Sequence, residues 1–253
     1  MQQSHGRPNS RIASVTVALG LILGTATASL GQAPSFTEAE LFFELNDTDG
    51  DLGIHASIDG GPYVMLEIED PSGREILKVT ALGRLFKQGL TQLSLESVEE
   101  PFEVLTPTQF FARFPEGWYE IEGTTRQGKE FKSRVRLSHV MAAPPSDILV
   151  GALPAAENCD DPNLPTVRLP VSIDWAPVED SHPTIGKPGS VEIVRYQFFV
   201  EQGDFKFGVD LPPTVTEFVV PAANLTSGVV KFEIIARTST GNNTAIESCF
   251  VVQ

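Results

Sequence analysis

Three aspartates recur at every second position of residues 46–54, which read Asn-Asp-Thr-Asp-Gly-Asp-Leu-Gly-Ile. In a looped backbone this spacing turns the carboxylates of Asp47, Asp49 and Asp51 toward one point. Carboxylate oxygens are ligands that Ca²⁺ prefers in proteins. Asp59 follows soon afterwards and could close the cage. The spacing therefore makes these four aspartates candidate ligands of a calcium ion.

The same segment can also be a plain hairpin loop without a ligand. It is similar to the start of an EF-hand loop, but Leu52 stands where that loop has its turn glycine, and Ile58 stands where it has a bidentate glutamate. Asp-Gly and Leu-Gly are ordinary turn pairs between the apolar segments 41–45 and 54–58. Repulsion among three carboxylates costs little in water. We favour the plain turn and keep the calcium site as the alternative.

Residues 106–114 predict the one helix of the chain and carry three phenylalanines. Thr106 is a suitable N-cap, and proline follows at the first helical position. Phe110, Phe111 and Phe114 fall on one face of the predicted helix. We expect them to plug the end of a domain, and a partner-binding aromatic patch is the alternative.

Trp118 and Tyr119 are a second pair of candidate binding residues. Two exposed rings could form a platform on which a sugar stacks. Successive side chains of a strand point to opposite faces, however, so one of the two rings must point inward. We keep Trp118 as a candidate partner-binding residue and carbohydrate as a candidate ligand.

Motifs of catalysis are missing from the sequence. It contains no GxSxG, HExxH, P-loop or GxGxxG pattern. His55, His139 and His182 lie far apart without metal-ligand spacing, and we interpret them as surface or strand residues. The sequence therefore predicts a protein that is not an enzyme.

The first 28 residues have the layout of a secretory signal peptide. Arg7 and Arg11 precede the apolar stretch 12–23, and the small residues 26–28 offer a cleavage site after Ala28. Removing this leader takes two arginines and no acid, which leaves 16 basic against 33 acidic residues and a formal charge of −17. Such an acidic chain is unsuited to binding nucleic acid. We expect a secreted or periplasmic protein without a membrane span in the mature chain.

Cys159 and Cys249 are the two cysteines of the chain. In an oxidising compartment, two cysteines of one domain are expected to form a disulfide bond. A catalytic thiol is the weaker interpretation, because the sequence has no CxxC pair and no motif surrounds the nearest histidine. We predict a structural Cys159–Cys249 bridge.

The rest of the sequence predicts an all-β protein of two tandem immunoglobulin-like β-sandwich domains. Short segments of alternating apolar residues are separated by Gly, Pro, Asn and Asp, as in the hairpins predicted at 64–80 and 118–140. Two adjacent prolines favour an extended linker at 142–146. We place the domains at 34–141 and 147–253, each near the ~100 residues of one sandwich.

The second domain resembles a fibronectin type III domain over about residues 145–253. Ser172-Ile-Asp-Trp-Ala-Pro-Val178 resembles strand B, Tyr196 sits like the tyrosine of strand C, and Phe218-Val-Val-Pro221 with Leu225 resembles strand E and the turn after it. The chain departs from the family at the tyrosine of the corner motif, where Val230 or Phe232 stands. The resemblance implies a sandwich fold, and it names no ligand.

Together these features predict a secreted or periplasmic, non-catalytic binding or scaffold protein that acts through contacts with an extracellular or periplasmic protein. Two alternatives stay open. One is a calcium-dependent adhesion or matrix protein, and the other is an accessory domain or enzyme of a carbohydrate-active system. Fold alone does not decide among these functions.

Overall fold

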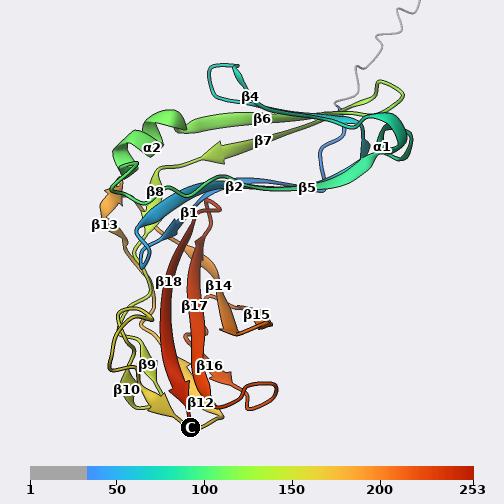
Figure 1. The fold of residues 1–253 in the computed structure, drawn as a ribbon. Coiled ribbons are helices and arrows are strands. Elements are labelled where there is room, and N and C mark those ends of the chain that lie inside the picture. The colour runs from blue at the N-terminus through green and yellow to red at the C-terminus, as the bar shows by residue number, and fades with distance from the viewer. Residues whose placement is uncertain (1–32) are drawn as a thin grey trace, which may run out of the picture. The chain divides into compact units, whose positions relative to one another are not determined.

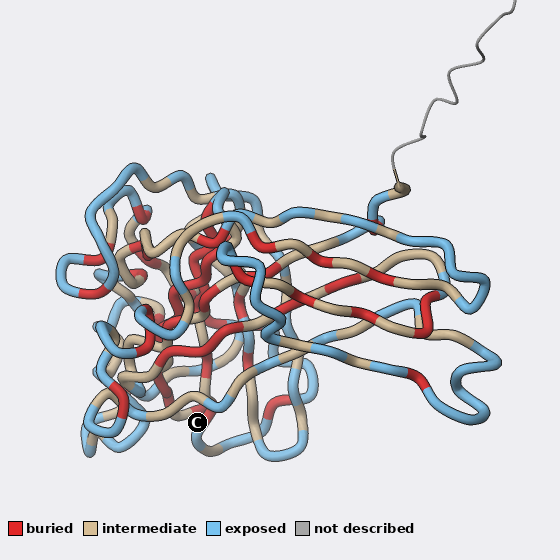
Figure 2. Tube along the Cα trace, turned by 90° about the horizontal axis from the view of Figure 1, so that it is seen from above, coloured by how far each residue is buried: buried red, intermediate tan, exposed pale blue. Residues whose placement is uncertain are grey.

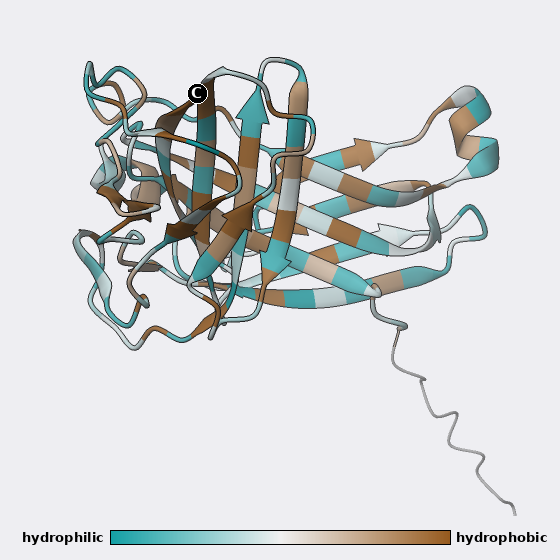
Figure 3. Cartoon of the chain, turned by 90° about the horizontal axis from the view of Figure 1, so that it is seen from below, coloured by the Kyte–Doolittle hydropathy of each residue, from teal (hydrophilic) through white to brown (hydrophobic). Residues whose placement is uncertain are grey.

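Strands dominate residues 33–253, the part of the chain that the computed structural model describes (Figure 1). Polar and apolar residues alternate along many of them, as Figure 3 shows, because one face of each sheet covers a core while the other meets solvent. The all-β sandwich class predicted from the sequence is confirmed. The predicted leader at 1–28 lies outside the described residues. Within 33–253, no helix has the length and apolar character needed to cross a membrane.

The N-terminal half contains two layers of strands with a core between them. One layer, with the order β1-β2-β5, is part of an eight-stranded sheet that continues into the C-terminal half, and the other layer has the order β4-β3-β6-β7. The elements are β1 (Glu38–Asn46), β2 (Asp51–Tyr63), β3 (Met65–Glu69), β4 (Glu75–Thr80), α1 (Gly83–Gln88), β5 (Leu90–Glu96), α2 (Pro107–Arg113), β6 (Gly117–Thr124) and β7 (Glu130–Leu137). The antiparallel pairs β3–β4 and β6–β7 confirm the two predicted hairpins.

Helix α2 confirms the predicted start signal. The Thr106 side chain accepts a hydrogen bond from the backbone N–H of Gln109, and the Gln109 side chain bonds back to the N-cap backbone, which completes a capping box. Phe110 and Phe111 are buried, and their rings lie 5.6 and 5.3 Å from that of Phe43. The core of the first half covers both rings, which argues against the partner-binding alternative for these two residues.

The C-terminal half has two further layers. One has the order β10-β9-β12-β16, and the other has the order β15-β14-β17-β18 with β11 beside β18. The elements are β9 (Leu149–Val150), β10 (Leu153–Pro154), β11 (Thr166–Val167), β12 (Val171–Asp174), β14 (Ile193–Gln202), β15 (Phe205–Leu211), β16 (Glu217–Val220), β17 (Gly228–Thr238) and β18 (Asn243–Val252). Figure 2 shows the buried residues in the interior of the chain trace, while the loops at its outer edges are largely exposed.

The residues that resemble a fibronectin type III domain lie in this second core. Trp175 is buried, with its ring edge against Tyr196 at 5.5 Å between centroids. The Tyr196 hydroxyl accepts a hydrogen bond of 2.9 Å from the backbone N–H of Val178. Val230 and Phe232 are both buried, and neither side chain has a hydroxyl group.

The predicted disulfide bond between Cys159 and Cys249 is confirmed. It ties the irregular segment before β11 to strand β18. The two cysteines are 90 positions apart in the sequence. Closing so long a loop restricts the unfolded chain and contributes ~4 kcal/mol in the chain-entropy account. The bridge is therefore structural.

The two halves are joined by hydrogen bonds instead of a free linker. Strand β1 pairs in parallel with β18, and β8 (Val140–Ala142) pairs with β13 (Ser181–Gly186). In the predicted linker 142–146, the Ala143 N–H donates to the Asp180 carbonyl, and the Ser146 carbonyl accepts from Ala176. One core draws on residues 36–141 with Ile185, and the other on 142–252. We retain the division at 142–146 as a proposal.

Asn242 is the central residue of this junction. Its side chain is fully buried; Oδ1 accepts from the backbone N–H of Phe43 at 3.0 Å, and Nδ2 donates to the carbonyls of Ser138 and Val140 at 2.8 and 3.0 Å. Thr244 adds a buried hydroxyl bond of 3.0 Å to the Ala142 carbonyl. These bonds satisfy backbone groups that water cannot reach.

We expect Asn242→Ala to lower the free energy of unfolding by ~3 kcal/mol, because it leaves one backbone N–H and two carbonyls without this partner. For a chain of this size, that loss lowers the melting midpoint by roughly 6 to 12 °C. Circular dichroism on heating measures it. Asn163→Ala, at an exposed site, is the matched control. Equal midpoints for the native protein and Asn242→Ala would contradict this role.

Candidate functional site

The aspartate loop, residues 46–51, forms the turn of the β1–β2 hairpin. Asn46 pairs with Asp51 across the hairpin, and its Oδ1 accepts from the backbone N–H groups of Thr48 and Asp49 at 3.1 and 3.2 Å. Gly50 has a φ of +67°, a conformation that side chains other than glycine rarely adopt. The local structure is that of a hydrogen-bonded turn.

The structure does not bring the four predicted calcium ligands together. Asp59 lies eight positions beyond Asp51 on extended β2, which places it roughly 26 Å away along the strand. Its assignment to the same cage is therefore wrong. Asp47 bonds to His182, and Asp49 accepts from Asn46 Nδ2 at 3.3 Å. Within residues 33–253, no group of three or more His, Cys, Asp or Glu side chains could hold a metal ion.

His182 lies on strand β13, in agreement with its interpretation as a strand residue, and it is buried at the junction. Its Nδ1 accepts from the backbone N–H groups of Thr184 and Ile185 at 3.2 and 2.8 Å. Nε2 therefore carries the hydrogen and donates to Asp47 Oδ1 at 2.9 Å. Asp47 and His182 are 135 positions apart, and no local motif links them.

Several carboxylates lie close together beside the hairpin turn, and we call them the carboxylate cluster: Glu44, Asp49, Asp51, Glu99, Glu233 and Glu247. Burial raises the pKa of Asp51 to about 6, with help from Glu99 and other nearby acids. Burial likewise raises the pKa of Glu233 to about 7, and Glu247 and Glu44 add to the effect. Asp51 Oδ1 is buried and accepts no hydrogen bond from any residue that the structure describes. Ionisation of these carboxylates in the folded protein is therefore unfavourable.

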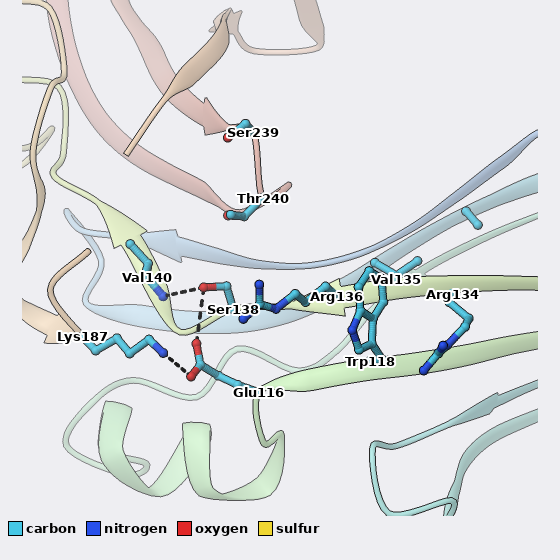
Figure 4. Close-up of a pocket in the computed structure, with 11 residues that line it drawn as sticks. Glu116, Trp118, Arg134, Val135, Arg136, Ser138, Val140, Lys187, Ser239 and Thr240 are labelled. Carbon is cyan, nitrogen blue, oxygen red and sulfur yellow. Dashed lines mark hydrogen bonds and ion pairs between the residues drawn. The ribbon is translucent and has the colours of Figure 1, made fainter. Parts of the chain in front are cut away.

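A groove of about 570 Å³ lies at the junction and brings basic side chains to one place (Figure 4). Strands β6 and β7 form one wall, and the turn between β17 and β18 lies across from them. The residues that line it are Ala39, Glu116, Trp118, Arg134, Val135, Arg136, Ser138, Val140, Lys187, Ser239 and Thr240. Three of these side chains are cationic in a chain whose formal charge is −15.

Arg136 is the free cation of this groove. On the outer face of the β3–β4–β6–β7 sheet, most basic side chains have a carboxylate partner, as Lys132 does in Glu120 and Glu122. Arg136 instead stands opposite Trp118 in the β6–β7 register. It is exposed and forms no ion pair with any residue in 33–253. Its guanidinium is available to a ligand.

Trp118 offers an aromatic surface beside this cation. Its side chain is 51% exposed, and the Arg134 guanidinium lies 5.3 Å from the ring centroid, within the range of a cation–π contact. Tyr119 takes the inward position of the pair and is fully buried, with its hydroxyl donating to the Pro115 carbonyl at 2.9 Å. The structure thus resolves which of the two rings points outward.

Lys187 closes the groove through an ion pair with Glu116. Burial works to raise the pKa of Glu116, but Lys187 and the backbone N–H of His139 outweigh it and lower the pKa. Glu116 is therefore ionised at neutral pH and neutralises much of the Lys187 charge. The pair joins the end of β13 to the start of β6, and it leaves Arg136 as the dominant positive charge.

Trp118 was a candidate from the sequence, whereas Arg134, Arg136 and Lys187 were not. A local pattern does indicate the two arginines, because Lys132-Ser-Arg-Val-Arg136 places basic residues at every second position of one strand. The third depends on how the two halves of the chain pack, which the sequence pattern does not show.

No protein-family model matches the chain, and no curated protein matches it. The solved structures that it resembles include a tetra-tandem repeat in the extending region of a large adhesion protein, at 12% identity and a TM-score of 0.29 over 85% of this chain and 50% of that one. Others are the fibronectin(III)-like modules of Clostridium thermocellum CbhA, at 12% and 0.30 over 89% and 92%, and chicken CNTN1 FN1–FN3 domains, at 10% and 0.36 over 87% and 65%. The chain spans half the length of the first.

We expect the stability of the protein to fall as pH rises from about 5 to 8, because the buried carboxylate cluster must ionise. A carboxyl whose pKa is raised in the folded state binds its proton more tightly there, so the free energy of unfolding decreases between the unfolded pKa and the folded one. For Glu233 this window runs from 4.5 to about 7. The expected loss is ~2 kcal/mol, allowing for partial exposure.

Glu233→Gln tests this directly, since it removes the charge and keeps the shape. The melting midpoint of this variant should change less between pH 5 and pH 8 than that of the native protein. Exposed Glu179→Gln is the matched control and should retain the native pH dependence. A pH profile of Glu233→Gln that superimposes on the native profile would refute the assignment.

Proposed function

We propose that the chain is a secreted, non-catalytic binding protein whose groove holds an acidic segment of a partner protein. The observation that carries this proposal is the exposed, unpaired Arg136 beside the half-exposed ring of Trp118. Arginine and tryptophan are enriched among residues that dominate protein interfaces. An acidic side chain on the partner would supply the carboxylate that Arg136 lacks.

The surrounding charge favours an anionic segment of limited size. The groove is positive, but the chain as a whole is strongly acidic, so a large polyanion would meet repulsion beyond the groove. A carboxylate that enters the groove can form a two-point contact with the planar guanidinium of Arg136. The adjacent indole ring can cover the apolar part of the same ligand residue.

The architecture supports a binding or scaffold role. We propose that residues 147–253 form a fibronectin type III-like domain and residues 34–141 an immunoglobulin-like sandwich, with the groove at their junction. Two packed sandwiches held by buried hydrogen bonds keep the walls of the groove in fixed positions. A rigid site loses less conformational entropy on binding.

Acidic carbohydrate is the second candidate ligand, and Trp118 favours it. An exposed indole beside an arginine can stack on a sugar ring while the guanidinium binds a carboxylate of the sugar. This candidate keeps the carbohydrate-active alternative open for the groove.

We expect Arg136→Ala to weaken binding of a short peptide that contains both glutamate and leucine about tenfold, which corresponds to ~1.4 kcal/mol. Trp118→Ala should weaken it by a similar factor, because the indole ring no longer covers the apolar part of the bound peptide. Fluorescence anisotropy of a labelled peptide in low and high salt measures the dissociation constant. Arg168→Ala is the matched control, because Arg168 is exposed and follows β11, whose partner residues are at the C-terminal end of β18.

An oligogalacturonate and a neutral dextran oligomer are tested beside the peptide. Binding of the peptide that depends on Arg136 supports the protein-partner proposal. Binding of the oligogalacturonate but not of the peptide would show that the groove is a carbohydrate site. Equal binding by the native protein and all variants would show that the groove is not the binding site.

The calcium-dependent alternative now depends on Asp49 and Asp51. Ca²⁺ takes six to eight oxygen ligands, whereas Asp47 is bonded to His182 and Asp59 lies far along β2. We therefore expect equal melting midpoints in millimolar Ca²⁺ and in chelator. A rise of roughly 10 °C with Ca²⁺ that is absent from Asp49→Ala/Asp51→Ala would reinstate the calcium site.

A further inference from the structure

Helix α1 exposes every one of its side chains. It buries no residue, and its N-cap, Leu82, forms no side-chain capping bond. Leu82, Leu85 and Phe86 are 76%, 47% and 40% exposed. A helix in a globular protein ordinarily packs its apolar face against the core. The apolar face of α1 is therefore free to contact something outside the chain.

Basic side chains surround these apolar ones. Arg84 and Lys87 belong to α1, and Arg126 and Lys129 belong to the turn between β6 and β7. The turn lies beside the helix, with Arg126 Nη1 donating to the Lys87 carbonyl at 3.0 Å (Figure 1). We call this surface, residues 82–88 and 125–129, the basic tip.

The charge of the basic tip is not neutralised by neighbouring acids. All four of its basic side chains are exposed, and none forms an ion pair with any residue in the described part of the chain. Elsewhere the long cations mostly find carboxylates, as Lys78 does in Glu67 and Glu75. Residues 82–88 and 125–129 contain no acidic residue; the first acids after these two segments are Glu96 and Glu130.

We propose that the basic tip docks on an anionic lipid bilayer. Lysine and arginine near a bilayer surface are attracted to anionic headgroups, and leucine and phenylalanine enter the boundary between headgroups and acyl chains. The rest of the chain carries the acidic excess and is repelled by the same surface. Charge complementarity therefore favours an anionic bilayer as the partner and the basic tip as the part of the protein that contacts it.

Other occupants fit the basic tip less well. A symmetric contact with a second copy would place the same four cations against one another. The hollow between α1 and the β6–β7 turn is only about 100 Å³, smaller than the usual pocket for a small molecule. An anionic bilayer can contact the basic and the apolar side chains of the basic tip at the same time.

Vesicle sedimentation with residues 33–253 tests the proposal. Vesicles of phosphatidylcholine alone are compared with vesicles containing three parts of phosphatidylglycerol to seven of phosphatidylcholine, at low and high salt. We expect binding to the anionic vesicles only, weakened by salt. Arg84→Gln/Lys87→Gln should lower partitioning roughly 25-fold, at about fivefold for each charge. Phe86→Asp should also lower it.

Three matched controls separate this surface from others. Val98→Asp changes an exposed apolar residue outside the tip, Arg168→Gln an exposed cation outside it, and Arg136→Ala the groove, and all three should bind vesicles as the native protein does. Thermal unfolding checks that every variant is folded. Equal binding to both kinds of vesicle, binding to neither, or native binding by the tip variants would overturn the proposal. So would self-association without lipid that the tip variants abolish in analytical ultracentrifugation.

Discussion

The short parallel contact between β1 and β18 is the interaction on which the arrangement of residues 33–253 depends. It joins only Glu44–Asn46 to Asn243–Ala245, and so few strand pairs contribute little stability by themselves. The fully buried amide of Asn242 supports the contact, because any displacement would leave backbone groups of Phe43, Ser138 and Val140 without this partner. A buried polar network in which every member is satisfied specifies one arrangement. The basic groove and the carboxylate cluster are both formed at this junction.

Local patterns in the sequence predicted α2 and two hairpins but not helix α1, and the site depends on contacts between distant residues. The capping signal at Thr106 and the two hairpins each depend on residues close together in sequence, and their predictions are confirmed. The bond between Asp47 and His182 spans 135 positions, and that between Phe43 and Asn242 spans 199. Alternation shows that one of Trp118 and Tyr119 faces inward, but only the strand register and the hydroxyl bond to Pro115 decide which.

The carboxylate cluster is a destabilising feature of the junction between the two halves. Asp51 and Glu233 lie close enough to share the influence of Glu44, Asp49 and Glu247, and the pKa of each is raised by burial first and by these neighbours second. Lys231, paired with Glu247, is the cation that offsets part of the repulsion. Packing of the hairpin turn against β17 and β18 therefore has two opposite effects on the junction. Its hydrogen bonds stabilise the junction, whereas repulsion among the carboxylates destabilises it, and protonation of the carboxylates reduces that repulsion.

Unpaired cations have a particular meaning in so acidic a chain. With nearly twice as many acidic as basic residues, a long flexible side chain would ordinarily find a carboxylate nearby, and most in 33–253 do so. The exceptions are Arg168, Arg136 and the four cations of the basic tip, and only the last two places combine free charge with an exposed aromatic or aliphatic side chain. Because the remaining surface repels anions, charge alone would attract a ligand weakly at either place. A ligand that also buries apolar surface gains affinity that salt does not screen. The two sites are therefore suited to ligands that are anionic and partly apolar, and they discriminate against simple polyanions.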